Sequence, residues 1–307
     1  MGKGDKMAQP GPVVKVVVPV AGLGTRLLPA TKSQPKEMLP VGRRPVVQYV
    51  VEELERAGLD QILFITGRKK SAIEDHFDPD PELVQTLSSG GGYAMLEELK
   101  YTQTSARFYY TRQSVPRGLA DAVNHAREFV GEDHFVVALG DSIIKSRDGS
   151  SFLREMIATH LRTGAAGTIA VEEVDPADVF RYGIIKPKSG VEATDDFEIE
   201  DLVEKPRPEE APSSLAIAAR YVFSPVIFEA IHRTAPDRNG ELQLTDSIRL
   251  LLQLGHPVRV VRLRQGERRY DIGNFESYFK AFIDFALADE KYGYLVRQYL
   301  KRKVREF

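Results

Sequence analysis

The chain has 307 residues and a mass of 34.4 kDa, which suffices for two average domains or for one large α/β unit. Its 42% hydrophobic and 28% charged residues exclude a disordered, collagen-like or coiled-coil chain. A formal net charge of −2 provides no excess of basic charge, so we expect no nucleic-acid partner. The absence of cysteine excludes disulfides, cysteine-ligated zinc and thiol catalysis, and it is compatible with a reducing compartment.

The N-terminal residues give no sign of a targeting or membrane segment. Residues 1–11 contain glycines and charges without hydrophobic periodicity, so we expect a flexible leader. The first apolar run, from Val13 to Ala21, is interrupted by Lys15 and Pro19 and is far shorter than the roughly 20 residues of a membrane helix. It also lacks the order of regions that a signal peptide has. We therefore expect a cytoplasmic protein without a membrane partner.

Strands and helices alternate along the first half of the chain. The β-branched run at 14–20 predicts a buried strand, and the apolar residues of 45–57 recur at helical spacing. The alternation continues with strands at 61–66, 107–112, 134–139 and 166–172 and helices at 118–129 and 151–163. This order predicts an α/β fold with a doubly wound, mostly parallel mixed sheet, whose ligands bind at the carboxyl ends of the strands.

The pattern changes after about residue 173. Short strands are predicted at 182–186, 199–203, 215–222 and 258–263. We interpret them as the remainder of the sheet plus a smaller β subdomain over its mouth. Apolar residues at spacings of three and four predict helix within 275–303. We therefore expect one large domain at 12–274, with halves at about 12–173 and 174–274, followed by a C-terminal helical segment at 275–307.

A glycine-containing loop follows the first strand. It reads Ala21-Gly22-Leu23-Gly24-Thr25-Arg26. Glycines at such a place let backbone amides approach phosphate oxygens. A dinucleotide-binding fingerprint needs Gly or Ala where Leu27 stands, and a Walker loop needs a Gly-Lys-Ser/Thr triplet that this loop lacks. A Gly-x-Gly loop with cations at Arg26 and Lys36 suits a triphosphate, and the alternative is a glycine turn with two solvated cations.

The sequence around this loop is similar to that of a known family. The run AGLGTRLLPATKSQPKEMLPV resembles the signature of the sugar-phosphate nucleotidyltransferases, and most closely that of the bacterial UTP–glucose-1-phosphate uridylyltransferases, also called UDP-glucose pyrophosphorylases. The resemblance extends from residue 14 to about 286. It includes, in order, TGRKKSAIEDHFD, RQSVPRGLADAV, VVALGD, RYGII, LVEKP, GELQLTDSI and RYDIGNFESYFKA.

The resemblance implies a nucleotide-diphospho-sugar transferase fold, Mg²⁺ as cofactor, UTP and glucose 1-phosphate as substrates, and a homodimer or homotetramer. In the implied reaction, a phosphate oxygen of glucose 1-phosphate attacks the α-phosphorus of UTP in line with the departing pyrophosphate. Because this nucleophile is already an anion, catalysis consists of positioning two polyanions and neutralising their charge. No serine, cysteine or histidine nucleophile is required.

The resemblance also implies roles for individual residues. Carboxylate oxygens suit Mg²⁺, and the implied ligands are Asp141 and Asp271. The expected catalytic cations are Arg26, Lys36 and Lys205. Nucleotide binding is expected from Ala21, Gly22, Gly24, Thr25, Gln113 and Gly118, where the Gln113 amide can donate to and accept from a pyrimidine edge. Sugar-phosphate binding is expected from Gly183, Glu204 and Lys205.

Four positions, in three segments of the chain, depart from the pattern of the uridylyltransferases. Those enzymes usually read Gly-Leu-Gly-His-Ala where this chain has Gly-Leu-Ala120-Asp121-Ala, and the thymidylyltransferase branch also uses Gly-Leu-Ala. Ser142 stands where a second acidic residue is common near the metal. Ala219 stands where glycine is common, and its methyl group can alter the sugar pocket. The alternative function is therefore a dTDP-glucose or other NDP-sugar pyrophosphorylase.

Two other classes of protein are alternatives to the nucleotidyltransferase. A non-catalytic sugar-nucleotide-binding regulatory subunit predicts loss of the phosphate and metal residues, yet Arg26, Asp141 and Lys205 are present. A nicotinamide dehydrogenase on a similar sheet is disfavoured by Leu27. The pattern of residues favours the nucleotidyltransferase.

Overall fold

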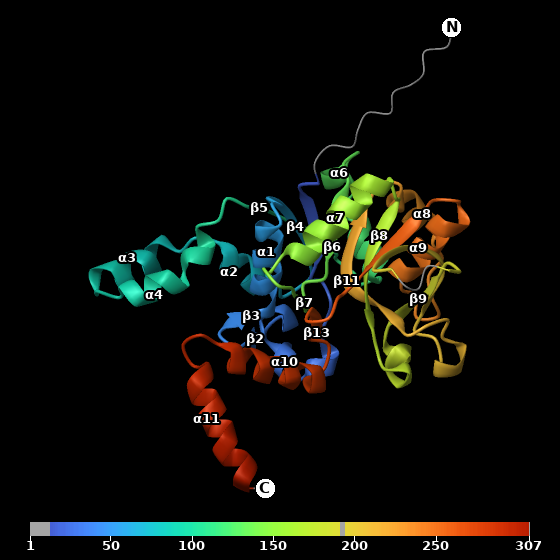
Figure 1. The fold of residues 1–307 in the computed structure, drawn as a ribbon. Coiled ribbons are helices and arrows are strands. Elements are labelled where there is room, and N and C mark those ends of the chain that lie inside the picture. The colour runs from blue at the N-terminus through green and yellow to red at the C-terminus, as the bar shows by residue number, and fades with distance from the viewer. Residues whose placement is uncertain (1–12, 191–193, 307) are drawn as a thin grey trace.

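A nine-stranded sheet runs through the computed structural model, which describes residues 13–190 and 194–306 of the chain (Figure 1). Its strands lie in the order β5 (Arg107–Arg112), β4 (Gln61–Thr66), β1 (Lys15–Pro19), β6 (Phe135–Ala138), β11 (Leu215–Phe223), β8 (Gly167–Glu173), β12 (Val258–Arg262), β10 (Asp196–Glu204) and β9 (Gly183–Pro187). The leader expected at 1–11 lies outside the described residues.

The sheet is mixed, as the sequence predicts, and one strand joins its two parallel parts. β5, β4, β1 and β6 are parallel neighbours, and β8 and β12 form a second parallel pair. β11 lies between these parts and is antiparallel to both, with Tyr221 opposite Val137 of β6 and Ile169 of β8. β10 and β9 then continue the sheet by antiparallel pairing. The carboxyl ends of β1 and β6 therefore lie side by side.

Helices cover both faces of this sheet (Figure 1). One face carries α5 (Leu119–Asn124), α6 (Arg127–Val130), α8 (Ile227–Arg233) and α9 (Leu244–Gln253). The other carries α1 (Val46–Arg56), α2 (Ser71–Phe77) and α7 (Ser151–Thr163). Successive side chains of a strand point to opposite faces, so Val17 of β1 packs into the first core, and Val16 and Val18 pack into the second. The α/β fold class is confirmed.

Two helical segments extend away from the sheet. α3 (Pro81–Ser89) and α4 (Tyr93–Glu98) form an arm that turns at the glycines 90–92. The predicted helix within 275–303 is divided into α10 (Phe275–Ala288) and α11 (Gly293–Lys303). Asp289 ends α10 in extended conformation, and its carboxylate accepts the amides of Lys291 and Tyr292 at 2.9 and 2.8 Å. Within the described residues, none of the helices combines the length and the apolar composition of a bilayer-spanning segment.

A small antiparallel sheet lies beside the large one. It consists of β7 (Ser142–Lys145) and β13 (Arg268–Asp271), and a second short pair is formed by β2 (Pro40–Val41) and β3 (Arg44–Pro45). A separate hydrophobic cluster joins these elements: Leu27 of the glycine loop, Ile143 of β7, Ile272 after β13 and Ala281 of α10 are all buried in it. The C-terminal helix α10 therefore supports the small sheet and the glycine loop together.

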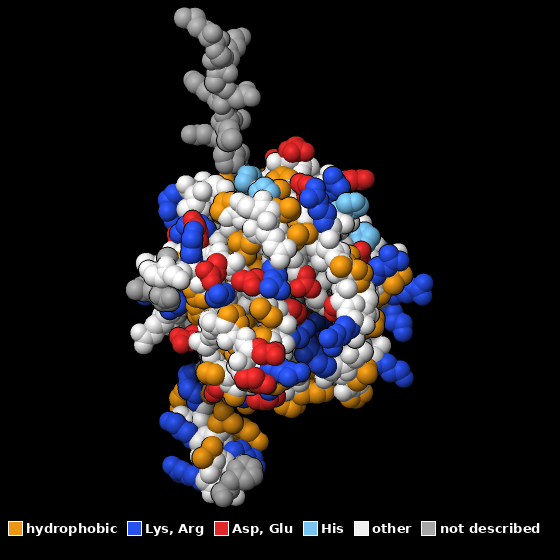
Figure 2. Space-filling model, turned by 90° about the vertical axis from the view of Figure 1, so that its right-hand side faces the viewer, with side chains coloured by type: hydrophobic (Ala, Val, Ile, Leu, Met, Phe, Trp, Pro, Cys, Tyr) orange, Lys and Arg blue, Asp and Glu red, His pale blue; other side chains and the backbone are white. Residues whose placement is uncertain are grey.

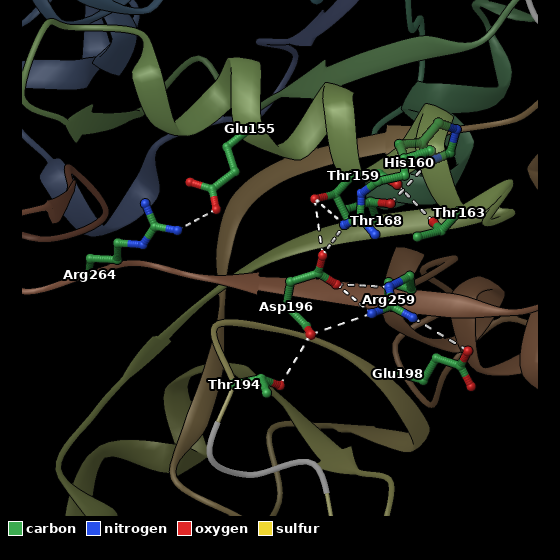
Figure 3. Close-up of polar contacts among 11 residues, drawn as sticks. Glu155, Thr159, His160, Thr163, Thr168, Thr194, Asp196, Glu198, Arg259 and Arg264 are labelled. Atoms are coloured by element: carbon green, nitrogen blue, oxygen red, sulfur yellow. Dashed lines mark hydrogen bonds and ion pairs between the residues drawn. The ribbon is translucent and has the colours of Figure 1, made fainter.

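The second half of the chain is tied to α7 by a polar network around Asp196 of β10 (Figure 3). The Asp196 carboxylate accepts hydrogen bonds from Arg259 of β12 at 2.9 and 2.6 Å, and from the Thr159 hydroxyl of α7 at 3.2 Å. Arg264, after β12, donates to Glu155 of α7 at 2.6 Å. These contacts join α7 to β10 and to the end of β12.

Candidate active site

The glycine loop after β1 is held by its own backbone contacts. Gly24 has a φ of +68°, a left-handed conformation that glycine adopts without strain. The Gly24 carbonyl accepts the Thr31 hydroxyl at 2.7 Å and the Leu27 amide at 3.0 Å. Leu27 is fully buried in the cluster beneath the loop. Leu27, which stands where a dinucleotide-binding fingerprint needs Gly or Ala, therefore anchors the glycine loop in the hydrophobic cluster.

Lys36 and Asp141 form a charged pair beside this loop. Lys36 Nζ donates to Asp141 Oδ2. Burial opposes the charge of both groups, but their mutual attraction outweighs it, so the pKa of Lys36 is raised and the pKa of Asp141 is lowered. Lys36 begins a short helical turn whose next residue, Glu37, pairs with Lys70 at 2.8 Å in the protein interior. That buried pair fixes the turn that presents the Lys36 ammonium.

The small sheet brings the two predicted metal ligands to one place. Asp271 at the end of β13 lies opposite Ser142 at the start of β7, and the Ile272 amide donates to the Asp141 carbonyl at 2.9 Å. Burial raises the pKa of Asp271, and the negative charge of Asp141 raises it further. A Cβ at Gly273 would lie 3.1 Å from Asp271 Oδ2 and 3.4 Å from Arg26 Nη2. Asp271 and Arg26 therefore both border Gly273.

A buried ion pair holds the bend that carries Asp141. Arg220 of β11 is fully buried and donates from Nη2 to Glu53 of α1 at 2.6 Å. The same nitrogen donates to the Ser142 carbonyl at 3.0 Å, directly after Asp141. Because an unpaired buried charge is costly, this contact fixes the bend between β6 and β7 against α1.

A first cavity, of about 380 Å³, opens beside the glycine loop. Its lining includes Ala21, Gly22, Gly24, Thr25, Arg26, Lys36, Gln113, Gly118 and Asp141. Gly118 has a φ of +98°, and a Cβ there would lie 2.4 Å from the Leu242 carbonyl oxygen. Position 118 therefore accepts only glycine, because any Cβ there would overlap the main chain of Leu242. The structure brings together every residue expected to bind the nucleotide.

A second cavity, of about 500 Å³, lies between β9, β10, β11 and β13. Its lining includes Gly183, Glu204, Lys205, Ala219 and Asp271, so it contains every residue expected to bind the sugar phosphate. Lys205 Nζ pairs with Glu204 Oε1 at 2.9 Å, and the Thr245 hydroxyl donates to Glu204 Oε2 at 2.7 Å. Figure 2, seen from the side of α9 and β9, shows acidic and basic side chains gathered around a hollow.

The two cavities meet at a shared wall. Arg26, Lys36 and Asp141 line both of them. Molecules bound in the two cavities would therefore approach each other at a point flanked by two cations and one partly buried carboxylate. Such an arrangement can join two anionic groups, because it neutralises their repulsion and fixes their relative orientation.

The residues at this wall also fit a divalent cation. Asp141 and Asp271 offer carboxylate oxygens, and the raised pKa of Asp271 reflects burial and the proximity of the two negative groups. Within residues 13–190 and 194–306, no group of three or more His, Cys, Asp or Glu side chains is arranged to hold a metal ion. Mg²⁺ binds through one or two carboxylates together with phosphates and waters, so two carboxylates beside an anion-binding cavity are a suitable donor set.

Several residues of the site have no role in the sequence analysis. Thr245 donates to Glu204, and Glu241 lines both cavities. Thr245 and Glu241 lie in GELQLTDSI, a segment that resembles the family but gives no role for either residue. Arg269 is buried in the second cavity, where it donates to Glu172 at 2.6 Å and lies 4.6 Å from the centre of the Tyr182 ring. In the sequence, the only feature that could have drawn attention to Arg269 is the pair of arginines before Tyr270.

Two residues of the second cavity have left-handed backbone conformations. Lys205 has a φ of +45° and Ala219 a φ of +60°, although neither is glycine. Ala219 lies where the pairing of β11 with β8 shifts register, between Ile217 and Tyr221. Strain of this kind persists where the surrounding structure holds it, and it concentrates at functional sites. The methyl group of Ala219 lines the second cavity, where the sequence analysis expects it.

Comparison with known proteins identifies the family. Residues 15–286 match the model of the nucleotidyl transferase family. The chain belongs to this family. The α/β mixed sheet and the two adjoining cavities are thus those of a nucleotidyltransferase, and the resemblance inferred from the motifs is confirmed.

The chain is similar to individual members over most of its length. A UTP–glucose-1-phosphate uridylyltransferase of Staphylococcus saprophyticus is 42% identical over 280 residues, which are 91% of this chain and 93% of that protein. The structure of UTP-bound UGPase from Acinetobacter baumannii matches with a TM-score of 0.86 and 36% identity, covering 94% of this chain and 98% of that one. A UDP-glucose pyrophosphorylase complexed with UDP-glucose matches with a TM-score of 0.80 and 34% identity, covering 90% of this chain and 100% of that one.

Proposed function

We propose that this chain converts UTP and α-D-glucose 1-phosphate into UDP-glucose and pyrophosphate. The observation that carries the proposal is the shared wall of Arg26, Lys36 and Asp141 between two polar cavities. A wall of this composition suits the joining of two phosphate groups. The names of the similar proteins supply the identity of the nucleotide and the sugar.

UTP fits the first cavity. Gly22 lies next to Lys36, whose Nζ would be 3.8 Å from a Cβ at Gly22, so a phosphate that approaches the Gly22 backbone also approaches the ammonium. Arg26 offers a planar fork of donors for a second group of phosphate oxygens. Gln113 and Gly118 line the same cavity, and the base binds beside them in this proposal.

Glucose 1-phosphate fits the second cavity. The Glu204 carboxylate accepts from two neighbouring sugar hydroxyls, and the bonds from Thr245 and Lys205 hold it in place. A Cβ at Gly183 would lie 2.9 Å from Ile217 and 3.0 Å from the Thr245 hydroxyl, so the packing of these two side chains against β9 requires glycine at this position. Lys205 supplies the cation for the sugar's phosphate.

The reaction is a single displacement at the α-phosphorus of UTP. An oxygen of the sugar's phosphate forms the new bond to phosphorus, while the bond from phosphorus to the oxygen shared with the β-phosphate breaks and pyrophosphate leaves. The nucleophile is an anion already, so this chain needs no base. Lys36 and Arg26 lie at the meeting point and stabilise the negative charge as it shifts in the transition state.

Mg²⁺ is the proposed cofactor, held by Asp141 and Asp271. When bound, it would neutralise part of the negative charge of the phosphate groups. Lys36 pairs directly with Asp141, and the positive charges of Arg269 and Arg26 also act on Asp271, whose pKa is nevertheless raised by burial and by Asp141. Binding of Mn²⁺ in its place can be followed by electron paramagnetic resonance in the presence of UTP. Loss of the bound signal in Asp141→Ala is expected, and an unchanged signal would contradict this role.

One assay tests the proposed reaction. The protein is incubated with Mg²⁺ and each of UTP, dTTP, CTP, ATP and GTP, with and without glucose 1-phosphate, and pyrophosphate is measured. The expected result is release that requires the sugar phosphate and is fastest with UTP. No release with any nucleotide would overturn the enzyme, and a higher rate with dTTP would replace the uridylyl assignment by the thymidylyl alternative that Ala120 and Asp121 raise.

We also propose that the protein forms a homodimer or homotetramer. α10 and α11 expose large apolar side chains, and α11 projects from the body with hydrophobic and basic groups on its surface (Figure 2). The exposed set is Phe279, Phe282, Ile283, Tyr294, Leu295 and Tyr299. Burial against another copy would remove this surface from water. Light scattering should give a multiple of 34.4 kDa, and the paired change Leu295→Glu and Tyr299→Glu should lower it.

The division of the chain and its location remain proposals as well. We propose that residues 12–274 form one catalytic domain with a nucleotide half at about 12–173 and a sugar half at 174–274, followed by a helical segment at 275–307. Strands from both halves join one sheet, which supports a single unit. A cytoplasmic location is proposed from the cysteine-free composition, which suits a reducing compartment. Limited proteolysis tests the division, and a cut near residue 173 that releases two stable halves would contradict it.

A further inference from the structure

The side-chain amide of Gln113 is held in one orientation. Gln113 is 4% exposed and lines the first cavity at the wall formed with Gly118. Its Nε2 donates to Asp121 Oδ2 at 2.7 Å and to the Gly118 carbonyl at 3.2 Å. Both partners are acceptors, since a carboxylate and a carbonyl have no hydrogen to donate. The two hydrogens of the amide nitrogen are therefore both used within the protein.

The acceptors that hold this nitrogen have contacts of their own. Gly118 packs closely against the main chain of Leu242. The Leu242 amide donates to the Arg117 carbonyl at 2.7 Å, and the Leu242 carbonyl accepts from the Ala120 amide at 3.0 Å. Asp121 lies in the first turn of α5, one residue beyond Ala120. The Gly118 carbonyl cannot move away without breaking these contacts, and Asp121 Oδ2 also lies 3.7 Å from His125 Nε2, four residues further along the chain. The amide nitrogen of Gln113 thus meets two acceptors, of which the Gly118 carbonyl is fixed by the backbone.

This arrangement leaves Gln113 Oε1 as the amide atom available to a ligand. Turning the amide over would offer Nε2 to the ligand instead, but it would place Oε1 against the Asp121 carboxylate and the Gly118 carbonyl. Facing acceptors repel each other, and a buried polar group without its partner is costly. Gln113 therefore presents an acceptor to the first cavity.

We propose that Asp121 is a positioning residue that makes this pocket select a pyrimidine with an N3–H donor. Uracil has that donor, whereas cytosine has an acceptor at N3. The Asp121 carboxylate holds Gln113 Oε1 toward this position and prevents the amide from turning to suit cytosine. Thymine shares the N3–H group with uracil, so this selection acts against cytosine and treats the other two bases alike. The inference rests on the proposed binding of UTP in the first cavity.

Nucleotide binding without the sugar phosphate tests the proposal independently of turnover. Calorimetry measures the Kd of UTP and of CTP for the wild type, Asp121→Ala, Asp121→Asn and Asn124→Ala. Asp121→Ala leaves only the Gly118 carbonyl to hold the amide, so the UTP-to-CTP affinity ratio should fall about tenfold. Asp121→Asn keeps an oxygen that accepts from Gln113 and should retain most of the ratio. Asn124→Ala changes an exposed residue of the same helix and is the matched control.

The ratio separates positioning from a general effect. Removal of a negative charge near the nucleotide changes the affinity for both triphosphates alike, so it cancels in the ratio. Asp121→Lys provides a second variant without an acceptor, and its ratio should fall as in Asp121→Ala. A wild type without preference for UTP, a ratio unchanged in both non-accepting variants, or an equal fall in Asn124→Ala would overturn the proposal. A wild type that binds UTP selectively but releases no pyrophosphate would overturn the proposed function and leave this inference standing.

Discussion

The two cavities that meet at Asp141 are built by different means. The first is shaped by backbone: Gly24 and Gly118 have positive φ angles, and a Cβ at Gly118 would overlap the main chain of Leu242. The second also contains left-handed backbone at Lys205 and Ala219, but its polar side chains are bonded to one another, including Thr245 with Glu204. Substitutions in the first cavity should therefore act through backbone shape, and those in the second through the loss of single hydrogen bonds.

The largest effect is expected at the wall that the two cavities share. Asp141→Ala removes a carboxylate that both cavities share, together with the partner of Lys36. Turnover should fall by roughly a thousandfold, because the change removes a proposed Mg²⁺ ligand and with it the neutralisation of phosphate charge that Mg²⁺ would supply. Steady-state kinetics and circular dichroism provide the measurement. Asp133→Ala, an exposed acid paired with Lys15, is the control, and near-normal turnover of a folded Asp141→Ala would refute the role.

Gly118→Ala should break the first cavity selectively. The added Cβ would lie 2.4 Å from the Leu242 carbonyl oxygen, and the φ of +98° is strained for alanine. We expect kcat/KM for UTP to fall by roughly a hundredfold, about 2.7 kcal/mol, while the KM for glucose 1-phosphate stays the same. Gly131→Ala is matched to it, because Gly131 has a φ of +59° with open space around its Cβ. An equal loss in both variants would show that strain alone is responsible.

Thr245→Val should break the second cavity selectively. The change keeps the shape of the side chain but removes the 2.7 Å hydrogen bond to Glu204. The KM for glucose 1-phosphate should rise about tenfold, in line with the roughly 1.5 kcal/mol of a hydrogen bond to a charged group, and the KM for UTP should not change. Thr234→Val, which removes a bonded hydroxyl outside both cavities, is the control. A change in the KM for UTP of equal size would contradict the separation of the cavities.

The smallest effect is a gain in stability. Ala219→Gly relieves the left-handed conformation at φ +60°, and against this stands the greater backbone freedom that glycine loses on folding. We expect the free energy of unfolding to rise by about 0.5 to 1 kcal/mol, measured by urea denaturation. Ala216→Gly, in the extended part of the same strand, should lower it. A loss of stability in Ala219→Gly would show that the residue is not strained.

Local patterns predict the large sheet well. The strands at 61–66 and 107–112 and the helix at 151–163 have the predicted bounds in the structure. Continuous β-branched runs and regular apolar spacing encode these elements locally. The arm of α3 and α4 and the pair of β7 with β13 were not predicted. The arm packs little apolar surface against the sheet, and a four-residue strand paired with a distant partner carries no local pattern.

The residues of the candidate site also differ in how well the sequence predicts them. The glycine loop and Gln113 lie in short motifs whose residue types indicate phosphate and base binding, and the structure places them in one cavity. Thr245 acquires its role only because the fold brings it to Glu204, which is 41 residues away in the chain. Arg220 is a strand residue whose partner, Glu53, is 167 residues away. Roles of this kind depend on tertiary contacts that a single sequence does not display.

In the proposed reaction, the uridylyl group passes directly between two substrates that meet at the shared wall. The configuration at the α-phosphorus distinguishes this direct transfer from a two-step route, and it can be followed with UTP that carries sulfur at that phosphorus in one known configuration. A single in-line displacement by glucose 1-phosphate inverts the configuration in the sugar-nucleotide product, and inversion is the result that we predict. Retention would require two successive displacements through a covalent intermediate on the protein, and it would contradict the account.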